Sequence, residues 1–132
     1  MKVIVDTSVW SLALRRHDPV DSPETLLLGT LIEEGENIFL LGIILQEILQ
    51  RVKQPRDFGR LRDQFDVFPL LPVRREHYIK AAELRNHLAR KDVQAATIDA
   101  LIAAVAIAHD CRLLTTDKDF HFIARHSDLK LL

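Results

Sequence analysis

The chain begins with Met1-Lys2-Val3-Ile4-Val5-Asp6, in which three β-branched residues in a row precede a carboxylate. A short apolar run that ends at a polar residue is typical of a strand buried on both faces. Such strands occur in parallel sheets that helices cover on both sides. We therefore expect an α/β fold, with Asp6 at the carboxyl end of its first strand.

The rest of the chain alternates between predicted helices and predicted strands. Ser22 and Pro23 mark one helix start, because serine is a favoured N-cap and proline is favoured at the first helical position; Gly35 marks the end of that helix. Pro69 lies in the third predicted strand and indicates a sheet edge, since proline cannot donate to a central ladder. The predicted strands are residues 2–6, 37–41, 66–71, 112–115 and 129–132, and the predicted helices are 8–14, 23–34, 44–52, 55–65, 74–90, 97–109 and 120–125.

These elements predict a three-layer α/β sandwich, in which helices flank a parallel sheet. The sequence contains no internal repeat, low-complexity tract or linker, so we expect residues 1–132 to form a single domain. Hydrophobic residues make up 48% of the chain and charged residues 28%, which is typical of a soluble globular protein.

The sequence also bears on the compartment. Its apolar runs are far shorter than the roughly 20 residues that span a bilayer. Asp6 lies where an export signal would need its apolar centre, and Cys111 is the only cysteine, which excludes a disulfide framework. We therefore expect a cytoplasmic protein with no membrane association.

The net charge of −1, from 18 basic and 19 acidic residues, is not that of a protein held on nucleic acid by bulk charge. It does not exclude a nucleic-acid substrate. If several acids gather at one metal site, the rest of the surface is more basic than the total charge suggests.

Two acids follow predicted strands. Parallel sheets bind ligands at the carboxyl ends of their strands, near the point where the strand order reverses. Asp6 ends the first strand and Asp117 follows the fourth, so both are expected at that edge. Each also has a purely structural interpretation: Asp6 could cap the next helix, and Asp117 could belong to a polar turn in which Asp119 caps the last helix.

Asp99 is the strongest single indication of a site. It is the only charged residue from Ala95 through Ala108, in a helix that is apolar nearly all round and therefore belongs in the core. A buried carboxylate costs several kcal/mol unless it is paired, hydrogen-bonded or bound to a metal. The helix dipole offsets only about 0.3–1 kcal/mol of that cost, and no basic residue lies within one turn.

Glu47 is a weak indication by itself, because a single glutamate on a helix is usually solvated. Together with Asp6, Asp99 and Asp117, however, it can converge on one pole of the fold. Clusters of oxygen ligands select hard cations such as Mg²⁺ or Mn²⁺. Without a cation the carboxylates would repel one another, so the set is best interpreted as a metal site.

At this point the sequence resembles the PIN-domain family, and closely the VapC toxins of type II toxin–antitoxin pairs. The resemblance implies a five-stranded parallel sheet in the order 3-2-1-4-5 and an acidic metal site formed by Asp6, Glu47, Asp99 and Asp117. Arg51 departs from the pattern, since relatives often carry glycine there. The matching stretches are Val3-Ile4-Val5-Asp6-Thr7-Ser8-Val9-Trp10, Ile44-Leu45-Gln46-Glu47-Ile48-Leu49-Gln50, Thr97-Ile98-Asp99-Ala100-Leu101-Ile102-Ala103-Ala104 and Leu114-Thr115-Thr116-Asp117-Lys118-Asp119-Phe120.

Other side chains are expected around these acids. Asp119 matches the second acid of the last stretch, and Thr7, Ser8 and Thr116 are expected to orient the carboxylates. Weaker candidates for contacts with a nucleic-acid backbone are Arg15, Arg16, Lys53 and Arg56.

The resemblance implies an endoribonuclease that hydrolyses RNA phosphodiesters with one or two Mg²⁺ or Mn²⁺ ions per site. It also implies a homodimer and a cognate VapB-like antitoxin that inhibits by occupying the site. The alternative within the same fold is a catalytically inert PIN scaffold that acts through binding, although such a scaffold has no need to retain Asp99 in an apolar helix.

Other phosphotransfer folds fit less well. A haloacid-dehalogenase pattern needs a second aspartate two residues after Asp6, where this chain has Ser8. A receiver domain needs a pair of acids near the end of its first strand and a phospho-accepting aspartate after a central strand, and neither stands out. The four glycines of the chain, Gly29, Gly35, Gly42 and Gly59, cannot form a phosphate-binding P-loop.

Overall fold

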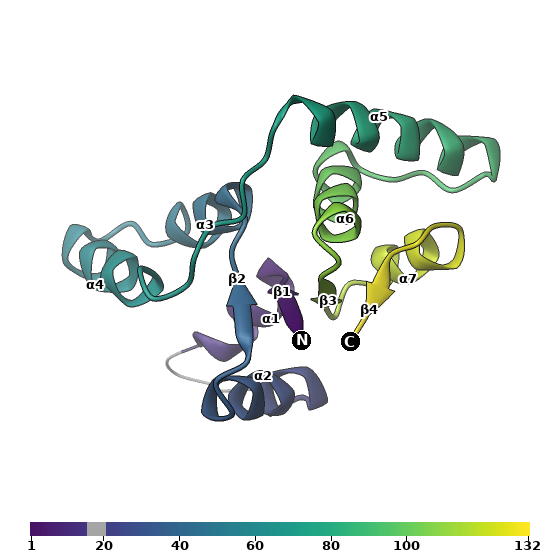
Figure 1. Cartoon of the computed structure of the whole chain (residues 1–132). Helices are drawn as coiled ribbons and strands as arrows, with labels where there is room; N and C mark the ends of the chain where they lie inside the picture. Colours follow the sequence, from purple (N-terminus) through teal and green to yellow (C-terminus); the bar gives the residue numbers. More distant parts are fainter. Residues whose placement is uncertain (16–20) are drawn as a thin grey trace.

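A parallel β-sheet lies at the centre of the protein (Figure 1). The computed structural model describes residues 1–15 and 21–132. Within these residues the sheet has four strands, in the order β2-β1-β3-β4, and every pairing is parallel. The strands are β1 (Lys2–Val5), β2 (Asn37–Phe39), β3 (Arg112–Leu114) and β4 (Lys130–Leu131). The predicted α/β class with a parallel sheet is therefore confirmed.

The prediction of a fifth strand at residues 66–71 was wrong. That segment forms only one isolated parallel bridge, between Leu40 and Leu70, outside β2. Its two hydrogen bonds run from Leu40 N to Pro69 O and from Leu71 N to Leu40 O, both 2.9 Å long. The segment occupies the edge position expected of it, but Pro69 has no N–H group with which to extend the ladder.

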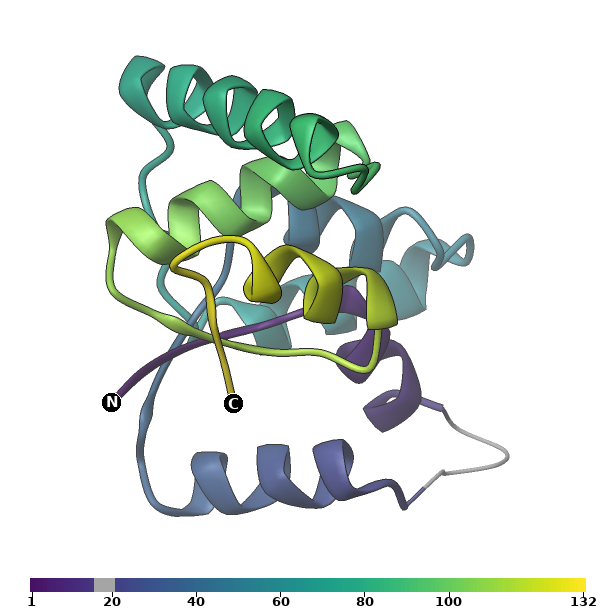
Figure 2. The same ribbon diagram turned by 90° about the vertical axis from the view of Figure 1, so that its right-hand side faces the viewer.

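Helices lie on both sides of the sheet. Figure 2 shows the strands between α2 on one side and α5 and α6 on the other. None of the described helices is long and apolar enough to cross a membrane. The helices are α1 (Thr7–Ala13), α2 (Pro23–Glu33), α3 (Gly42–Leu49), α4 (Pro55–Phe65), α5 (Arg75–Arg90), α6 (Thr97–Ala108) and α7 (Lys118–Arg125).

The predicted ends of α2 are confirmed. The Ser22 hydroxyl accepts a hydrogen bond from Thr25 N at 3.1 Å, which satisfies one of the free N–H groups of the first turn. Gly35 follows the last turn with a φ of 69°, a left-handed conformation that costs glycine little because it has no Cβ.

The core is built around β1 and α6. Val3, Ile4 and Val5 are completely buried, as expected for a strand covered on both faces. The α6 helix contributes a run of buried residues from Ile102 through Ala106 and packs against α5. Asp6, directly after β1, and Asp99, in the first turn of α6, are therefore held by elements that form the core.

Candidate metal centre

The pairing of β1 with β3 positions the first acid. Val5 is in register with Leu114, and Asp6 N donates a 2.9 Å hydrogen bond to Leu114 O, which continues the ladder by one residue. Asp6 is 7% exposed, and its Oδ2 accepts hydrogen bonds from Ser8 Oγ and Thr115 Oγ1, both at 2.8 Å. Two hydroxyl donors therefore fix the orientation of this carboxylate.

The same hydroxyl groups connect Asp6 to the segment that carries Asp117. Ser8 Oγ lies 3.3 Å from Thr115 Oγ1 and accepts from Thr116 N at 3.1 Å. Thr115 Oγ1 accepts from Asp117 N at 3.0 Å. This network ties the first turn of α1 to the segment that precedes α7, and so links the backbone at Asp117 to the Asp6 carboxylate.

The network differs in part from the predicted one. Ser8 contacts Asp6 as expected. Thr116 takes part through its backbone N–H group, and among the described residues its side chain donates to no carboxylate. The Thr7 hydroxyl is buried without a hydrogen-bond partner among the described residues. Thr115 is the residue that sequence reasoning missed. A buried hydroxyl residue directly after the apolar run of β3 was the available signal.

Asp117 also belongs to a compact group of three acids. One carboxylate oxygen from each of Asp99, Asp117 and Asp119 lies within 4.8 Å of the others. Asp99 belongs to the first turn of α6, and Asp119 to the first turn of α7. Asp117 is the N-cap of α7, where its Oδ1 accepts from Asp119 N at 2.9 Å. The structural interpretation in which Asp119 caps this helix was therefore wrong.

Asp99 experiences the charge of the whole cluster. Burial and the negative charges of Asp117, Asp6, Asp119 and Glu47, in that order, raise the pKa of Asp99 from 3.8 to about 6. Glu47, half-buried on α3, is thus close enough to influence Asp99, although neither Glu47 nor Asp6 belongs to the compact group of three. Among the described residues, none of the five acids forms an ion pair.

The compact group fits a small divalent cation. Mg²⁺ binds oxygen ligands at roughly 2.0–2.1 Å, so two ligands on opposite sides of the ion lie about 4 Å apart. The 4.8 Å limit on the spacing of these three oxygens therefore requires only small rotations of the side chains. A cation would also relieve the repulsion that raises the pKa of Asp99.

The structure describes three of the four residues that were predicted to contact a nucleic-acid backbone. Arg15, Lys53 and Arg56 are exposed, and none of them forms an ion pair with the five acids in the described part of the chain. Arg16 lies outside the residues that the structure describes. The roles of these four residues remain predictions.

Comparison with known families bears directly on this arrangement. The PIN domain matches residues 3–126, a segment that contains all five acids. The chain belongs to the PIN-domain family. It is also VapC-like, because it is 30% identical over 130 residues to VapC ribonuclease Mb1587 of Mycobacterium bovis and to Ribonuclease VapC11 of Mycobacterium tuberculosis. These alignments cover 97% of this chain and 96% of each relative.

A solved structure supports the fold of this PIN-domain chain. VapBC2 from Rickettsia felis, bound to a DNA fragment from its promoter, superposes with a TM-score of 0.78 and covers 100% of this chain and 98% of the matched chain. At 20% sequence identity, that likeness is evidence of the fold alone.

Proposed function

We propose that this PIN-domain chain is a metal-dependent endoribonuclease and the toxin of a toxin–antitoxin pair, with residues 1–132 acting as one nuclease domain. The observation that carries the proposal is the gathering of five acids without a basic partner among the described residues. Unpaired carboxylates in such proximity are costly unless a cation binds them. The relatives named as ribonucleases, matched over nearly their full length, support RNA as the substrate.

In this proposal Asp6, Glu47, Asp99 and Asp117 are the catalytic and metal-binding residues, and Asp119 contributes a further oxygen beside Asp99 and Asp117. A bound Mg²⁺ or Mn²⁺ supplies Lewis-acid stabilisation of the phosphodiester and lowers the pKa of an attacking water. Ser8 and Thr115 hold Asp6 in place through their hydroxyl groups. Glu47, outside the compact group but near Asp99, accepts a proton or holds a water.

The proposed partners follow from the relatives. We infer a VapB-like antitoxin as the inhibitor and a homodimer as the functional form, as the resemblance to VapC toxins implies; the match to a chain of the structure named VapBC2 supports the antitoxin. The competing function is an inert PIN scaffold that only binds. Such a scaffold would have no use for a half-buried acid whose pKa is raised to about 6 by burial and by the charges of four other acids.

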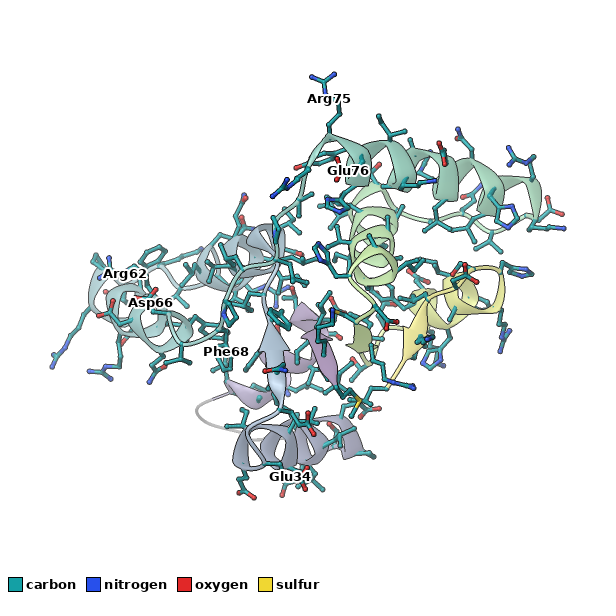
Figure 3. All side chains as sticks on the ribbon, viewed as in Figure 1. Glu34, Arg62, Asp66, Phe68, Arg75 and Glu76 are labelled. Carbon is teal, nitrogen blue, oxygen red and sulfur yellow. The ribbon has the colours of Figure 1, made fainter. Side chains whose placement is uncertain are left out.

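The deciding experiment is RNA cleavage by the purified protein with Mg²⁺, with Mn²⁺ and with a chelator, alongside Asp6→Asn and Asp99→Asn. Asp66→Asn is a matched control, because Asp66 is exposed at the end of α4, far from the sheet ends (Figure 3). We expect cleavage that needs metal, persists in the control and disappears in both site variants, provided that all three variants remain folded.

Other outcomes point elsewhere. Equal cleavage by all proteins would identify a contaminating nuclease. No cleavage by any protein, together with no binding of Mn²⁺ in a titration, would favour the inert scaffold.

A further inference from the structure

A cavity between α1, α3 and α4 is lined by three arginines. It has a volume of about 700 Å³ and lies between the end of α1, the end of α3 and the α4 helix from Asp57 to Gln64. The arginines are Arg15, Arg51 and Arg60, and among the described lining residues the only acid is Asp57. Three basic residues thus line one space in a chain whose net charge is −1.

The walls of this arginine cavity are anchored by two contacts. Arg51 Nη1 donates a hydrogen bond to Ser11 Oγ, which joins the segment after α3 to α1. The Trp10 ring of α1 packs edge-on against Phe65 at the end of α4, with 4.8 Å between ring centroids. The two contacts hold α1 against both other walls. The three arginines, each of them exposed, thus line a cavity whose walls are joined by side-chain contacts.

The arginine cavity and the acidic centre share two elements. Asp6 precedes α1, whereas Ser11 and Arg15, at the other end of that helix, line the cavity. At a rise of 1.5 Å per residue, the distance along the helix axis from Asp6 to these residues is about 8–14 Å. On α3, Glu47 immediately precedes Ile48, which lines the cavity. A single nucleic-acid strand can therefore reach both regions at once.

We propose that the arginine cavity binds backbone phosphates of the same RNA strand whose scissile bond lies at the acids. This inference rests on the proposed ribonuclease function and adds the location of the flanking phosphates. The planar guanidinium group matches two phosphate oxygens with parallel hydrogen bonds, and it remains charged at any working pH. Binding of this kind depends on charge and not on base identity, so the cavity positions the strand without reading its sequence.

The arginines of the cavity also offset the electrostatic repulsion between the five acids and an RNA strand. A polyanion that approaches five carboxylates is repelled until metal binds, whereas three nearby guanidinium groups attract it. The arginine cavity thus explains how a chain with no overall positive charge could hold RNA. The attraction should be sensitive to salt, because the binding of each phosphate releases condensed counterions.

The test uses the Asp99→Asn protein, so that RNA is bound but not cut, with a fluorescent single-stranded RNA in Mg²⁺ at several salt concentrations. Arg51→Ala and Arg60→Ala are compared with Arg75→Ala, whose side chain projects away from the molecule at the start of α5 (Figure 3). We expect each cavity variant to weaken RNA binding about 5- to 10-fold. The salt slope should fall by about 0.7 for each phosphate of the single strand that the variant no longer neutralises. The Arg75→Ala protein should bind as its parent does.

Two controls separate a loss of RNA contacts from a loss of folding. Circular dichroism establishes that each variant is folded, and Arg51→Lys, which keeps the charge but loses the planar fork, should retain part of the affinity. Unchanged RNA affinity and salt slope in both alanine variants would overturn the proposal. So would a loss of affinity for a polyglutamate peptide with no change toward RNA, because the cavity would then serve an acidic protein segment.

Different results would contradict the arginine-cavity proposal and the proposed ribonuclease function. If the wild-type protein cuts RNA and the two arginine variants cut and bind as well as it does, only the arginine cavity is misassigned. If RNA binding depends on Arg51 and Arg60 but no cleavage occurs under any metal condition, the cavity assignment survives and the ribonuclease function does not.

Discussion

The acidic centre and the arginine cavity both involve α1 and α3 but are constructed differently. The acids come from four separate segments of the chain, and hydrogen bonds between distant residues hold Asp6 to the segment of Asp117. The arginines come from the end of α1, from α4 and from the turn after α3, and one hydrogen bond from Arg51 to Ser11 links two of these segments. Acidic and basic side chains of this chain therefore gather in different regions. The net charge close to zero conceals both groups.

The construction matches what each region would have to do. A metal site needs carboxylates held within a few tenths of an ångström, because a small cation tolerates little variation in its geometry. A phosphate-binding region can be looser, because a guanidinium group attracts a phosphate over several ångströms. Changes to the acidic centre should therefore have larger effects than changes to the arginine cavity.

The largest effect is expected from Asp117→Asn. An asparagine side chain can still accept from Asp119 N and cap α7, but it removes the negative charge that a cation needs. We expect RNA cleavage to fall by roughly 100-fold or more with little change in Tm. Asp117→Ala should lose cleavage equally and also lose about 1 kcal/mol of stability with the cap. Metal-dependent cleavage assays and thermal denaturation test both variants, and normal cleavage by Asp117→Asn would remove this residue from the metal site.

A smaller effect is expected from Thr115→Val, which removes the hydroxyl that donates to Asp6 Oδ2 without changing the side-chain shape. Loss of such an orienting group typically lowers metal affinity by about 10- to 100-fold. Thr116→Ala is the matched control, because only the backbone N–H group of Thr116 takes part in the network. Mn²⁺ titration of the three proteins measures the difference. Equal affinities would mean that Ser8 alone is enough to orient Asp6.

The salt dependence of RNA cleavage should distinguish the arginine cavity from the acidic centre. In cleavage assays at low RNA concentration, we expect the wild-type rate to fall steeply as salt rises from about 50 to about 200 mM. The Arg51→Ala/Arg60→Ala double variant should be slower by about tenfold at low salt, and the difference should shrink at high salt. Metal affinity should stay the same, because neither arginine belongs to the acidic group. A double variant with an altered affinity for Mn²⁺ would show that the two regions are structurally coupled.

The smallest effect is on stability. Because the pKa of Asp99 in the folded protein is about 6, above its ordinary value of 3.8, protonation of Asp99 favours the folded state. This contribution is fully present below about pH 4 and is lost as the pH rises through 6. In a chelator, Asp99→Asn should therefore have a Tm a few degrees above that of the wild type at pH 8, and the difference should be much smaller near pH 4. Added Mg²⁺ should also reduce the difference at pH 8. Equal pH profiles for the two proteins would mean that the pKa of Asp99 is not raised.

Much of the fold could be predicted because it depends on local signals. The β-branched run at Val3 to Val5, the Ser22 cap and the Gly35 stop each indicate a structure within a few residues, and the structure contains all three. The segment at residues 66–71 was misjudged for the opposite reason. Its apolar character suits a strand, but pairing depends on how far a neighbouring strand extends, and Pro69 leaves only one bridge with Leu40.

Some features of the candidate site could likewise be predicted from the sequence and others could not. Asp6 and Asp117 could be placed at one sheet edge, because parallel strands bring their carboxyl ends together. The sequence did not identify Thr115 as the partner of Asp6, nor Asp117 as the cap of α7. Both depend on the direction in which a side chain points, and hydrophobic patterning does not indicate that direction.

By itself, therefore, the sequence determined the alternation of strands and helices, the apolar core and the set of acids at the strand ends. Tertiary structure alone decided which of these acids form a compact group, which hydroxyls orient them, and that three arginines border one cavity. The physical reason is the difference in sequence range between local and tertiary interactions. Propensity and capping act over a few residues, whereas the hydrogen bond between Thr115 and Asp6 joins residues 109 positions apart.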